Sequence, residues 1–290
     1  MERLQTVGDN APQIEYWNGP AGEKWAKGAA SQDAMLEPLG MAAMDVGRIQ
    51  PGDTVLDVGC GSGGATLEIA RRVGSGGRVL GVDVSTPMLD VARARLDVLG
   101  NDRGGGGVTF ENKDVATYPF EAGMFDIVFS RFGVMFFVDP VVAFSNIRTG
   151  LKSGGRLAFV CWQALNKNPR MELPVTIALK YVPAPPPKGP ETPGPLAFAD
   201  PDRVRRILSA AGFDDILIEP FETVLHLGED IPGAVQKLMG SGQAGRLIGP
   251  APDAVKTKIA KDIANSITGY QTDDGVKMRG AVWVVTATAP

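Results

Sequence analysis

Cysteine and histidine are scarce in this 290-residue sequence, which contains two cysteines, Cys60 and Cys161, and one histidine, His226. Two thiols and one imidazole cannot supply the usual four Cys/His ligands of a zinc site. A single pair of cysteines also gives no disulfide framework. The hydrophobic content of 44% is nevertheless sufficient for a sizeable core in a chain of this length.

Long apolar runs and runs of basic residues are missing as well. The longest apolar stretch, residues 125–138, is interrupted by Asp126, Ser130 and Arg131, and the first residues lack the apolar segment of a secretion signal. A formal net charge of -4 gives no general attraction to nucleic acid or anionic lipid. We therefore expect a cytoplasmic protein without membrane insertion or a nucleic-acid partner, either monomer or homodimer.

From residue 53 onward, short apolar runs alternate with helical stretches, and this order predicts an α/β fold with a parallel sheet. Ser85 or Thr86 is expected to cap one of these helices with its side chain. Four successive glycines, Gly104 to Gly107, predict a surface loop. The expected strands are 54–58, 78–82, 108–114, 125–130, 155–162, 215–227 and 280–287, and the expected helices are 65–73, 86–99, 140–151 and 203–211.

This pattern divides the chain into four expected parts. Residues 1–50 are expected to form a helical cover before the sheet, and residues 51–162 the core. Prolines crowd residues 182–195, so the segment 163–199 is expected to leave the sheet and form a lid. Residues 200–290 are expected to complete the sheet, with a helical insertion at about 228–278.

A glycine-rich turn follows the first expected strand. Gly59, Gly61 and Gly64 satisfy the dinucleotide pattern G-x-G-x-x-G, and Asp83 lies where a ribose-binding acid is expected. A nicotinamide-dependent oxidoreductase is therefore one interpretation. Two features disfavour it: Asp57 precedes the first glycine by two residues, and the strand follows a helical segment instead of opening the chain. No tyrosine has a lysine four residues later, so the usual catalytic pair is missing too.

Three motifs in order resemble those of class I S-adenosylmethionine-dependent methyltransferases, in particular the type 11 group, which includes quinone C-methyltransferases. They are Val55 to Gly63, Gly81 to Ser85 and Phe125 to Phe132. The resemblance implies a doubly wound, Rossmann-like sheet of seven mostly parallel strands, with one antiparallel strand near the edge and helices on both faces. It also implies S-adenosylmethionine as the cofactor and S-adenosylhomocysteine as its product.

The resemblance assigns roles to individual residues. Asp83 is expected to accept from both ribose hydroxyls, and Asp57 to attract the ammonium group of the cofactor. Asp114 is expected to accept from the adenine amino group. The other expected cofactor contacts are Gly59, Cys60, Gly61, Gly63, Val84, Met88, Val115, Arg131 and Trp25. Met88 can equally be a core residue, and Trp25 can equally anchor the cover.

The acceptor pocket is expected at Phe132, Met135, Phe136 and Trp162, whose apolar side chains favour a small, largely apolar acceptor methylated on carbon or oxygen. Residues 131–138 lack clustered acids, so the reaction is expected to need no metal. No catalytic base is predicted, because His226 is interpreted as structural. The alternative from another class is a binding protein that keeps the fold but has lost turnover.

Overall fold

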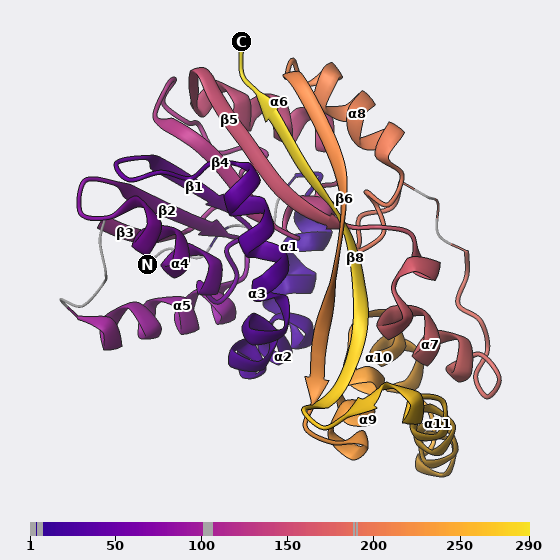
Figure 1. The fold of residues 1–290 in the computed structure, drawn as a ribbon. Helices are drawn as coiled ribbons and strands as arrows, with labels where there is room; N and C mark the ends of the chain where they lie inside the picture. Colours follow the sequence, from indigo (N-terminus) through magenta and orange to yellow (C-terminus); the bar gives the residue numbers. More distant parts are fainter. Residues whose placement is uncertain (1–3, 5–7, 101–106, 188, 190) are drawn as a thin grey trace. The chain divides into compact units, whose positions relative to one another are not determined.

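The computed structural model describes residues 4, 8–100, 107–187, 189 and 191–290 (Figure 1). The chain forms two compact units. Unit 1 comprises Met1–Trp162, Pro193–Phe221 and Trp283–Pro290, and unit 2 comprises Gln163–Thr192 and Glu222–Val282. Of the glycine loop expected at Gly104 to Gly107, only Gly107 lies within the described residues.

Three helices precede the sheet of unit 1: α1 (Ala11–Asn18), α2 (Pro20–Lys27) and α3 (Ala29–Val46). Proline occupies the first turn of α1 and of α2, where its missing N–H removes no helical hydrogen bond. The buried side of α3 includes Leu39, Ala43 and Met44, and this helix packs against α4, β4 and β5.

The centre of unit 1 is a run of five parallel strands in the order β3-β2-β1-β4-β5. Their apolar residues are almost completely buried, as expected for a parallel sheet covered on both faces. The strands are β1 (Thr54–Val58), β2 (Arg78–Asp83), β3 (Gly107–Asn112), β4 (Phe125–Arg131) and β5 (Leu151–Trp162).

The sheet order continues with β8 (Gly275–Thr288) and β6 (Asp214–Gly228). Within unit 1, β8 runs antiparallel to β5, because Gly154 N donates to Ala289 O and Ala289 N donates to Gly155 O. This confirms the expected path of seven strands with an antiparallel strand near the edge. A further strand of two residues, β7 (Gln271–Thr272), pairs antiparallel with β8 in unit 2.

Helices cover both faces of the central strands (Figure 1). One face carries α3, α4 (Gly64–Val73) and α5 (Thr86–Leu99), and the other carries α6 (Pro140–Gly150) and α8 (Pro201–Ala210). The largest side chains in the core are phenylalanines, and Phe144 packs against Phe159, Phe198 and Phe213. This aromatic contact joins α6 to β5 and to the chain on either side of α8.

Unit 2 is mainly helical. Asn168, which is fully buried, accepts from Ala281 N and donates to Ala281 O, so one amide fixes the start of the first helix to β8. Parts of the expected lid and of the expected insertion thus belong to the same unit, while the role of a lid stays a prediction. The helices are α7 (Pro169–Ala178), α9 (Ile231–Gly240), α10 (Gly242–Ile248) and α11 (Asp253–Ser266), with short turns η2 (Leu165–Lys167) and η3 (Thr268–Tyr270).

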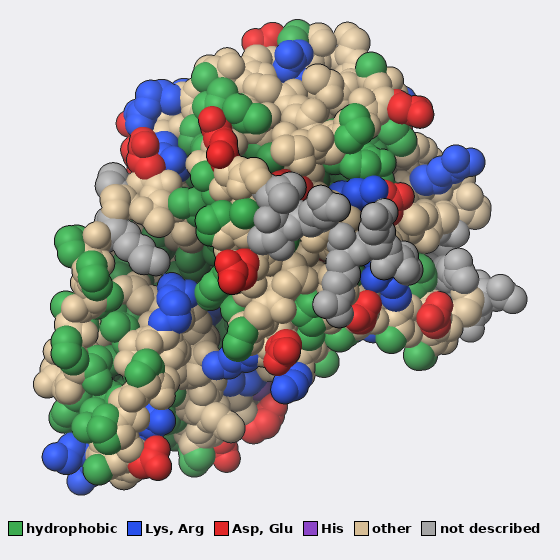
Figure 2. All heavy atoms as spheres, turned by 180° about the vertical axis from the view of Figure 1, so that it is seen from behind, with side chains coloured by type: hydrophobic (Ala, Val, Ile, Leu, Met, Phe, Trp, Pro, Cys, Tyr) green, Lys and Arg blue, Asp and Glu red, His purple; other side chains and the backbone are tan. Residues whose placement is uncertain are grey.

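The surface carries both signs of charge. Figure 2 shows Lys and Arg side chains interspersed with Asp and Glu on one face of the described residues. No helix within the described part of the chain has both the length and the apolar character that crossing a membrane requires.

Candidate functional site

The carboxyl ends of β1, β2, β3 and β4 share one edge of the sheet, because these strands are parallel. The turn that follows β1 is shaped by Gly59, Gly61 and Gly63, which have φ angles of 68°, 55° and 81°. Gly59 also lies against Gly133 after β4: a Cβ added at Gly59 would be 2.7 Å from Gly133 Cα. Glycine is therefore required for this turn to pack against the chain after β4.

Asp57, near the end of β1, is a buried carboxylate with one unsatisfied oxygen. Its Oδ2 accepts from Thr66 Oγ1 at 2.6 Å, whereas Oδ1 is buried and has no hydrogen-bond partner among the described residues. Burial raises the pKa of Asp57 to about 6, and the positive charge of Arg131 opposes that rise. The free oxygen is an acceptor for a donor that the described part of the chain does not provide.

Asp83, at the end of β2, has a different environment. Its Oδ2 accepts from Gly61 N and its Oδ1 accepts from Ser85 N, both at 2.8 Å. Burial raises its pKa to about 6, and these backbone donors oppose the rise. The carboxylate therefore fixes the glycine turn and the start of α5 while keeping lone pairs for further donors.

Cys60 belongs to the glycine turn itself, and Met88 lies beside it. The Cys60 side chain is buried near Gly81, and burial raises the pKa of its thiol, so the thiol stays protonated at neutral pH. The Met88 sulfur lies 3.7 Å from the Cβ position of Gly61, and the residue is buried. Both side chains border the turn, and neither carries charge into it.

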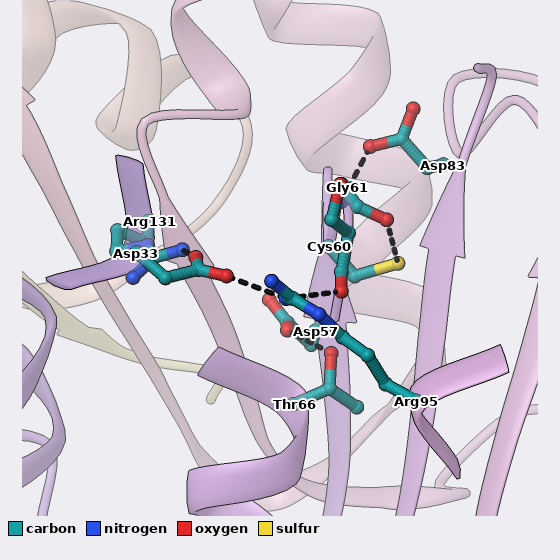
Figure 3. A network of polar contacts seen from close by, with 9 residues as sticks. Asp33, Asp57, Cys60, Gly61, Thr66, Asp83, Arg95 and Arg131 are labelled. Atoms are coloured by element: carbon teal, nitrogen blue, oxygen red, sulfur yellow. Dashed lines mark hydrogen bonds and ion pairs between the residues drawn. The ribbon is translucent and has the colours of Figure 1, made fainter. Parts of the chain in front are cut away.

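Arg131 is held by an acidic residue that the sequence pattern did not indicate. Its guanidinium forms an ion pair with Asp33 of α3, and the same carboxylate lies 2.6 Å from Arg95 Nη1 (Figure 3). Arg95 also donates to Ser62 O at 2.8 Å. A Cβ at Gly64 would be 2.4 Å from Asp33 Cγ, so the glycine makes room for the acid. Arg131 is thus held by Asp33, and it acts on Asp57 only through its charge.

A pocket of about 240 Å³ opens beside this ion-pair network in unit 1. It is bounded mainly by α3 and α4, and it has a mixed polar and apolar lining. The lining residues are Asp33, Ala34, Glu37, Gly40, Met41, Met44, Gly64, Ala65, Glu68 and Arg131.

Helix α1 is attached to the ends of β2 and β3 by side-chain hydrogen bonds. Asn18 donates to Val84 O at 2.8 Å and accepts from Thr86 N at 2.9 Å. Ser85 is the N-cap residue of α5, but its side chain makes no capping hydrogen bond, and its Oγ donates to Trp17 O at 2.7 Å. Of the two side chains expected to cap this helix, Ser85 or Thr86, Ser85 does not. The Ser85 hydroxyl therefore attaches the N-terminal segment to the end of β2.

Asp114, after β3, is also bound to the N-terminal segment. Asn10 Nδ2 donates to Asp114 Oδ2 at 3.0 Å, and Ala116 N donates to Oδ1 at the same distance. The next residue, Val115, is buried, and its carbonyl accepts from Asn146 Nδ2 at 2.7 Å. The end of β3 is therefore held from both sides.

The aromatic residues expected to line the methyl-acceptor pocket fall into two groups. Phe132 and Trp162 stack with ring centroids 4.4 Å apart and an interplanar angle of 9°. Phe132 has a φ of 67°, an unusual conformation for a bulky residue and one that is often found at functional sites. Phe136 instead packs edge-on against Trp17, with centroids 5.0 Å apart.

Two further expected contacts, Met135 and Trp25, extend these groups. Met135 is buried, and its carbonyl accepts from Gly194 N at 3.0 Å. Trp25 is half-buried and lies edge-on to Trp17 at 6.3 Å, which joins α2 to the second group. The cover and the chain after β4 thus meet through aromatic rings.

His226 hydrogen-bonds to Asp274 O at 3.0 Å within unit 2. Among the described residues, no three His, Cys, Asp or Glu side chains are grouped as metal ligands. The interpretation of His226 as structural fits its partner, while the metal-free reaction stays a prediction.

Residues 55–155 match the family model described as a methyltransferase domain. This part of the chain is a class I methyltransferase domain. The chain is 34% identical over 122 residues to aklanonic acid methyltransferase of Streptomyces sp. strain C5, covering 42% of this chain and 54% of that protein. It is 36% identical over 123 residues to nocamycin O-methyltransferase of Saccharothrix syringae, covering 42% of each. The chain thus spans about half the length of these curated relatives.

The fold is also similar to solved structures. Phosphoethanolamine N-methyltransferase 2 of Haemonchus contortus, in complex with S-adenosyl-L-methionine, aligns with a TM-score of 0.56 and 19% identity, over 96% of this chain and 60% of that one. A SAM-dependent methyltransferase of Aquifex aeolicus aligns with a TM-score of 0.50 and 16% identity, over 99% and 100%. At these identities the likeness establishes the methyltransferase fold for the chain as a whole.

Proposed function

We propose that the protein is an S-adenosylmethionine-dependent methyltransferase that methylates a small, largely apolar acceptor on carbon or oxygen without a metal. The observation that carries the proposal is Asp57 Oδ1, a buried carboxylate oxygen without a partner among the described residues, beside a turn of positive-φ glycines. An enclosed carboxylate of this kind is stabilised by a ligand that brings a cation to it.

The hydrogen-bond acceptors of the site match the hydrogen-bond donors of this cofactor. S-adenosylmethionine presents an ammonium group, two ribose hydroxyls and an adenine amino group, all of which donate hydrogen bonds. Asp57 is suited to the ammonium, Asp83 to the hydroxyls and Asp114 to the amino group. The turn at Gly59, Gly61 and Gly63 allows the backbone to approach a ligand where a side chain would collide.

The sulfonium of the cofactor supplies an electrophilic methyl group, so the residues of the chain have to orient the acceptor and exclude water. Such alignment contributes roughly 7 to 11 kcal/mol to lowering a barrier. Phe132 and Trp162 offer a rigid apolar wall for this purpose, and Phe136 with Trp17 offers a second one. We assign no general base.

The acceptor class rests on two supports. The walls formed by these aromatic pairs carry no charged group, which favours an apolar acceptor over a phosphorylated or highly polar one. The two curated relatives are named for aklanonic acid and for nocamycin, which supports an organic small molecule. A catalytically silent binding protein would bind the same cofactor but methylate no acceptor.

Calorimetric titration of the purified chain with S-adenosylmethionine, S-adenosylhomocysteine, NAD⁺ and NADH tests the proposal. We expect micromolar binding of the first two alone, and a large loss of affinity in Asp83→Ala. Asp90→Asn, which alters an exposed acid on α5, is the matched control and should leave binding unchanged. Preference for a nicotinamide cofactor, or no binding of any of the four, would overturn the proposal.

A screen of apolar aromatic acceptors with labelled S-adenosylmethionine then separates an enzyme from a silent binding protein. We expect methyl transfer that EDTA does not abolish. Binding without transfer to any acceptor would favour the binding protein, and loss of transfer on chelation would contradict the metal-free reaction.

A further inference from the structure

We propose that Asn10 and Gln13 join Asp114 in a set of hydrogen-bond acceptors that selects a cofactor base carrying an amino group. Both residues belong to the N-terminal helical segment. This inference rests on the proposed function, since it concerns the adenine end of the same site. Neither residue belongs to the motifs after the strands, and both come from the start of α1, about a hundred residues before Asp114 in the sequence.

The first observation is the orientation of the Asn10 amide. Its Nδ2 donates to Asp114 Oδ2 at 3.0 Å. Because an ionised carboxylate only accepts hydrogen bonds, this contact fixes which end of the amide faces Asp114. The other end, Oδ1, is buried and has no hydrogen-bond partner among the described residues. One side chain thus holds the acid and presents a second acceptor.

The second observation is independent of the first. Gln13 lies one helical turn further along α1, and its Oε1 is likewise buried without a partner in the described part of the chain. The backbone connects the two positions, because Gln13 N donates to Asn10 O at 3.0 Å. Asn10 is the N-cap of α1 and Gln13 is its third residue, so two orphaned acceptors occur at the start of this helix.

These oxygens share one chemical requirement. Burying an acceptor without a donor is unfavourable, so a ligand that fills this place has to bring N–H or O–H groups. Asp114 differs, because each of its oxygens already accepts one hydrogen bond, but both oxygens retain lone pairs for a further donor. A base with a 6-amino group satisfies such a set, whereas a base with a 6-oxo group would place oxygen against oxygen.

The attachment of α1 makes this selection possible without help from the rest of the cover. Asn18, at the other end of the helix, donates to Ile14 O and Val84 O and accepts from Thr86 N, so its amide is used in docking. Asn10 and Asn18 are therefore a matched pair: both amides attach α1 to the strand ends, but only Asn10 has an orphaned acceptor.

The test measures dissociation constants of the full-length chain for S-adenosylhomocysteine and for its des-amino analogue, in which hydrogen replaces the 6-amino group. The readout is the ratio of the two constants within each variant. For the wild type we expect the amino compound to bind on the order of 10- to 100-fold more tightly, as for hydrogen bonds to a charged acceptor. Asn10→Ala and Gln13→Met should each lower this ratio several-fold.

Asn18→Ala is the control for loosened docking of α1, and it should weaken both ligands together and leave the ratio unchanged. An unchanged ratio in both Asn10→Ala and Gln13→Met, with S-adenosylhomocysteine still bound, would overturn the inference and leave the proposed function standing. If Asn10→Ala binds neither compound, Gln13→Met decides alone, because it preserves the bond to Asp114. Wild-type protein that binds neither compound would refute the proposed function and this inference together.

Discussion

Asp57 and Asp83 belong to neighbouring strands, and the pKa of each is raised to about 6 by burial, yet their surroundings differ. Both oxygens of Asp83 accept from backbone amides, those of Gly61 and Ser85. Asp57 has one side-chain donor, Thr66, and one oxygen without a partner among the described residues. The difference shows that equal burial and equal pKa do not imply equal roles.

Asp83 shapes the site before any ligand arrives, since it connects the glycine turn to the start of α5. Asp57 forms no ion pair among the described residues. The positive charge of Arg131 lowers its pKa without a hydrogen bond between the two side chains. Asp57 therefore stores unfavourable free energy that a cationic ligand releases, whereas Asp83 gains most of its stabilisation from the chain.

The largest effect is expected from Gly59→Ala, because it disrupts the turn on which both carboxylates depend. The φ of 68° and the approach of Gly133 Cα to 2.7 Å of the added Cβ combine backbone strain with a backbone collision. We expect the free energy of unfolding to fall by about 3 kcal/mol or more in denaturant titration.

Gly123→Ala is the matched control for this variant. Gly123 has a φ of 70° and no atom within 4 Å of the added Cβ, so it isolates the conformational strain. Its loss should be about 1 to 2 kcal/mol. Equal losses at the two positions would show that packing of the turn against the chain after β4 contributes nothing.

The next effect separates the two carboxylates directly. Asp83→Asn replaces one acceptor by an amide NH₂ that faces a backbone N–H, so the free energy of unfolding should fall by about 1 to 3 kcal/mol. Asp57→Asn at pH 8 removes a buried ionised group and should leave stability unchanged or raised. Both variants should weaken binding of S-adenosylhomocysteine about 10- to 100-fold in calorimetry.

Stability changes of the same sign and size in Asp57→Asn and Asp83→Asn would refute the contrast. Asp126→Asn serves as a reference variant, because this acid forms a partly exposed ion pair with Lys152 at the amino end of β4. It should leave ligand binding unaltered.

The sequence could predict features that depend on neighbouring residues, but not features that depend on residues far away in the chain. The turn after β1 was predictable because glycine spacing and an acid at a strand end are local patterns with few conformational solutions. The parallel sheet followed from alternating strands and helices, and its antiparallel strand near the edge from the family resemblance. These features hardly depend on which distant residue lies opposite.

Asp33 and Asn10 were not predictable in this way. Each acts through a partner about a hundred residues away, Arg131 and Asp114 respectively, and neither position departs from an ordinary amphipathic helix pattern. The prediction of a side-chain cap at Ser85 failed as well. The capping rule uses local sequence only, whereas the Ser85 hydroxyl donates to Trp17 O, which is distant in the sequence. Nor did a local pattern indicate that segments on either side of β6 share unit 2.

A smaller effect is expected from pH. The folded pKa values of Asp57 and Asp83, about 6, lie above the ordinary value of 3.8. Their contribution to stability is therefore complete below pH 3.8 and is lost as pH rises through 6. The stability difference between Asp57→Asn and wild type should change in favour of the variant across this window, as thermal unfolding can measure.

Ligand affinity should change in the opposite direction over the same window, because the proposed contact with the ammonium group of S-adenosylhomocysteine requires ionised Asp57. Affinity should rise by up to about tenfold per pH unit below 6 and then level off. Calorimetry in buffers of different ionisation enthalpy should detect proton release near pH 6. A flat profile in the wild type, or proton release that is as large in Asp57→Asn as in the wild type, would contradict the role given to Asp57. Release that remains in this variant at a reduced level belongs to Asp83, whose pKa is also raised to about 6.

The smallest effect concerns the ion pair that adjoins Asp57. Asp33 raises the pKa of Asp57 and Arg131 lowers it, so Asp33→Asn should shift the midpoint of the affinity profile downward and Arg131→Gln upward. Each shift should be less than about one pH unit, because the groups are partly exposed and act in a screened environment. Salt should reduce both shifts, and the exposed variant Asp90→Asn should produce none. Shifts of the same sign in Asp33→Asn and Arg131→Gln would mean that the two residues act on Asp57 through the position of α3 and not through their charges.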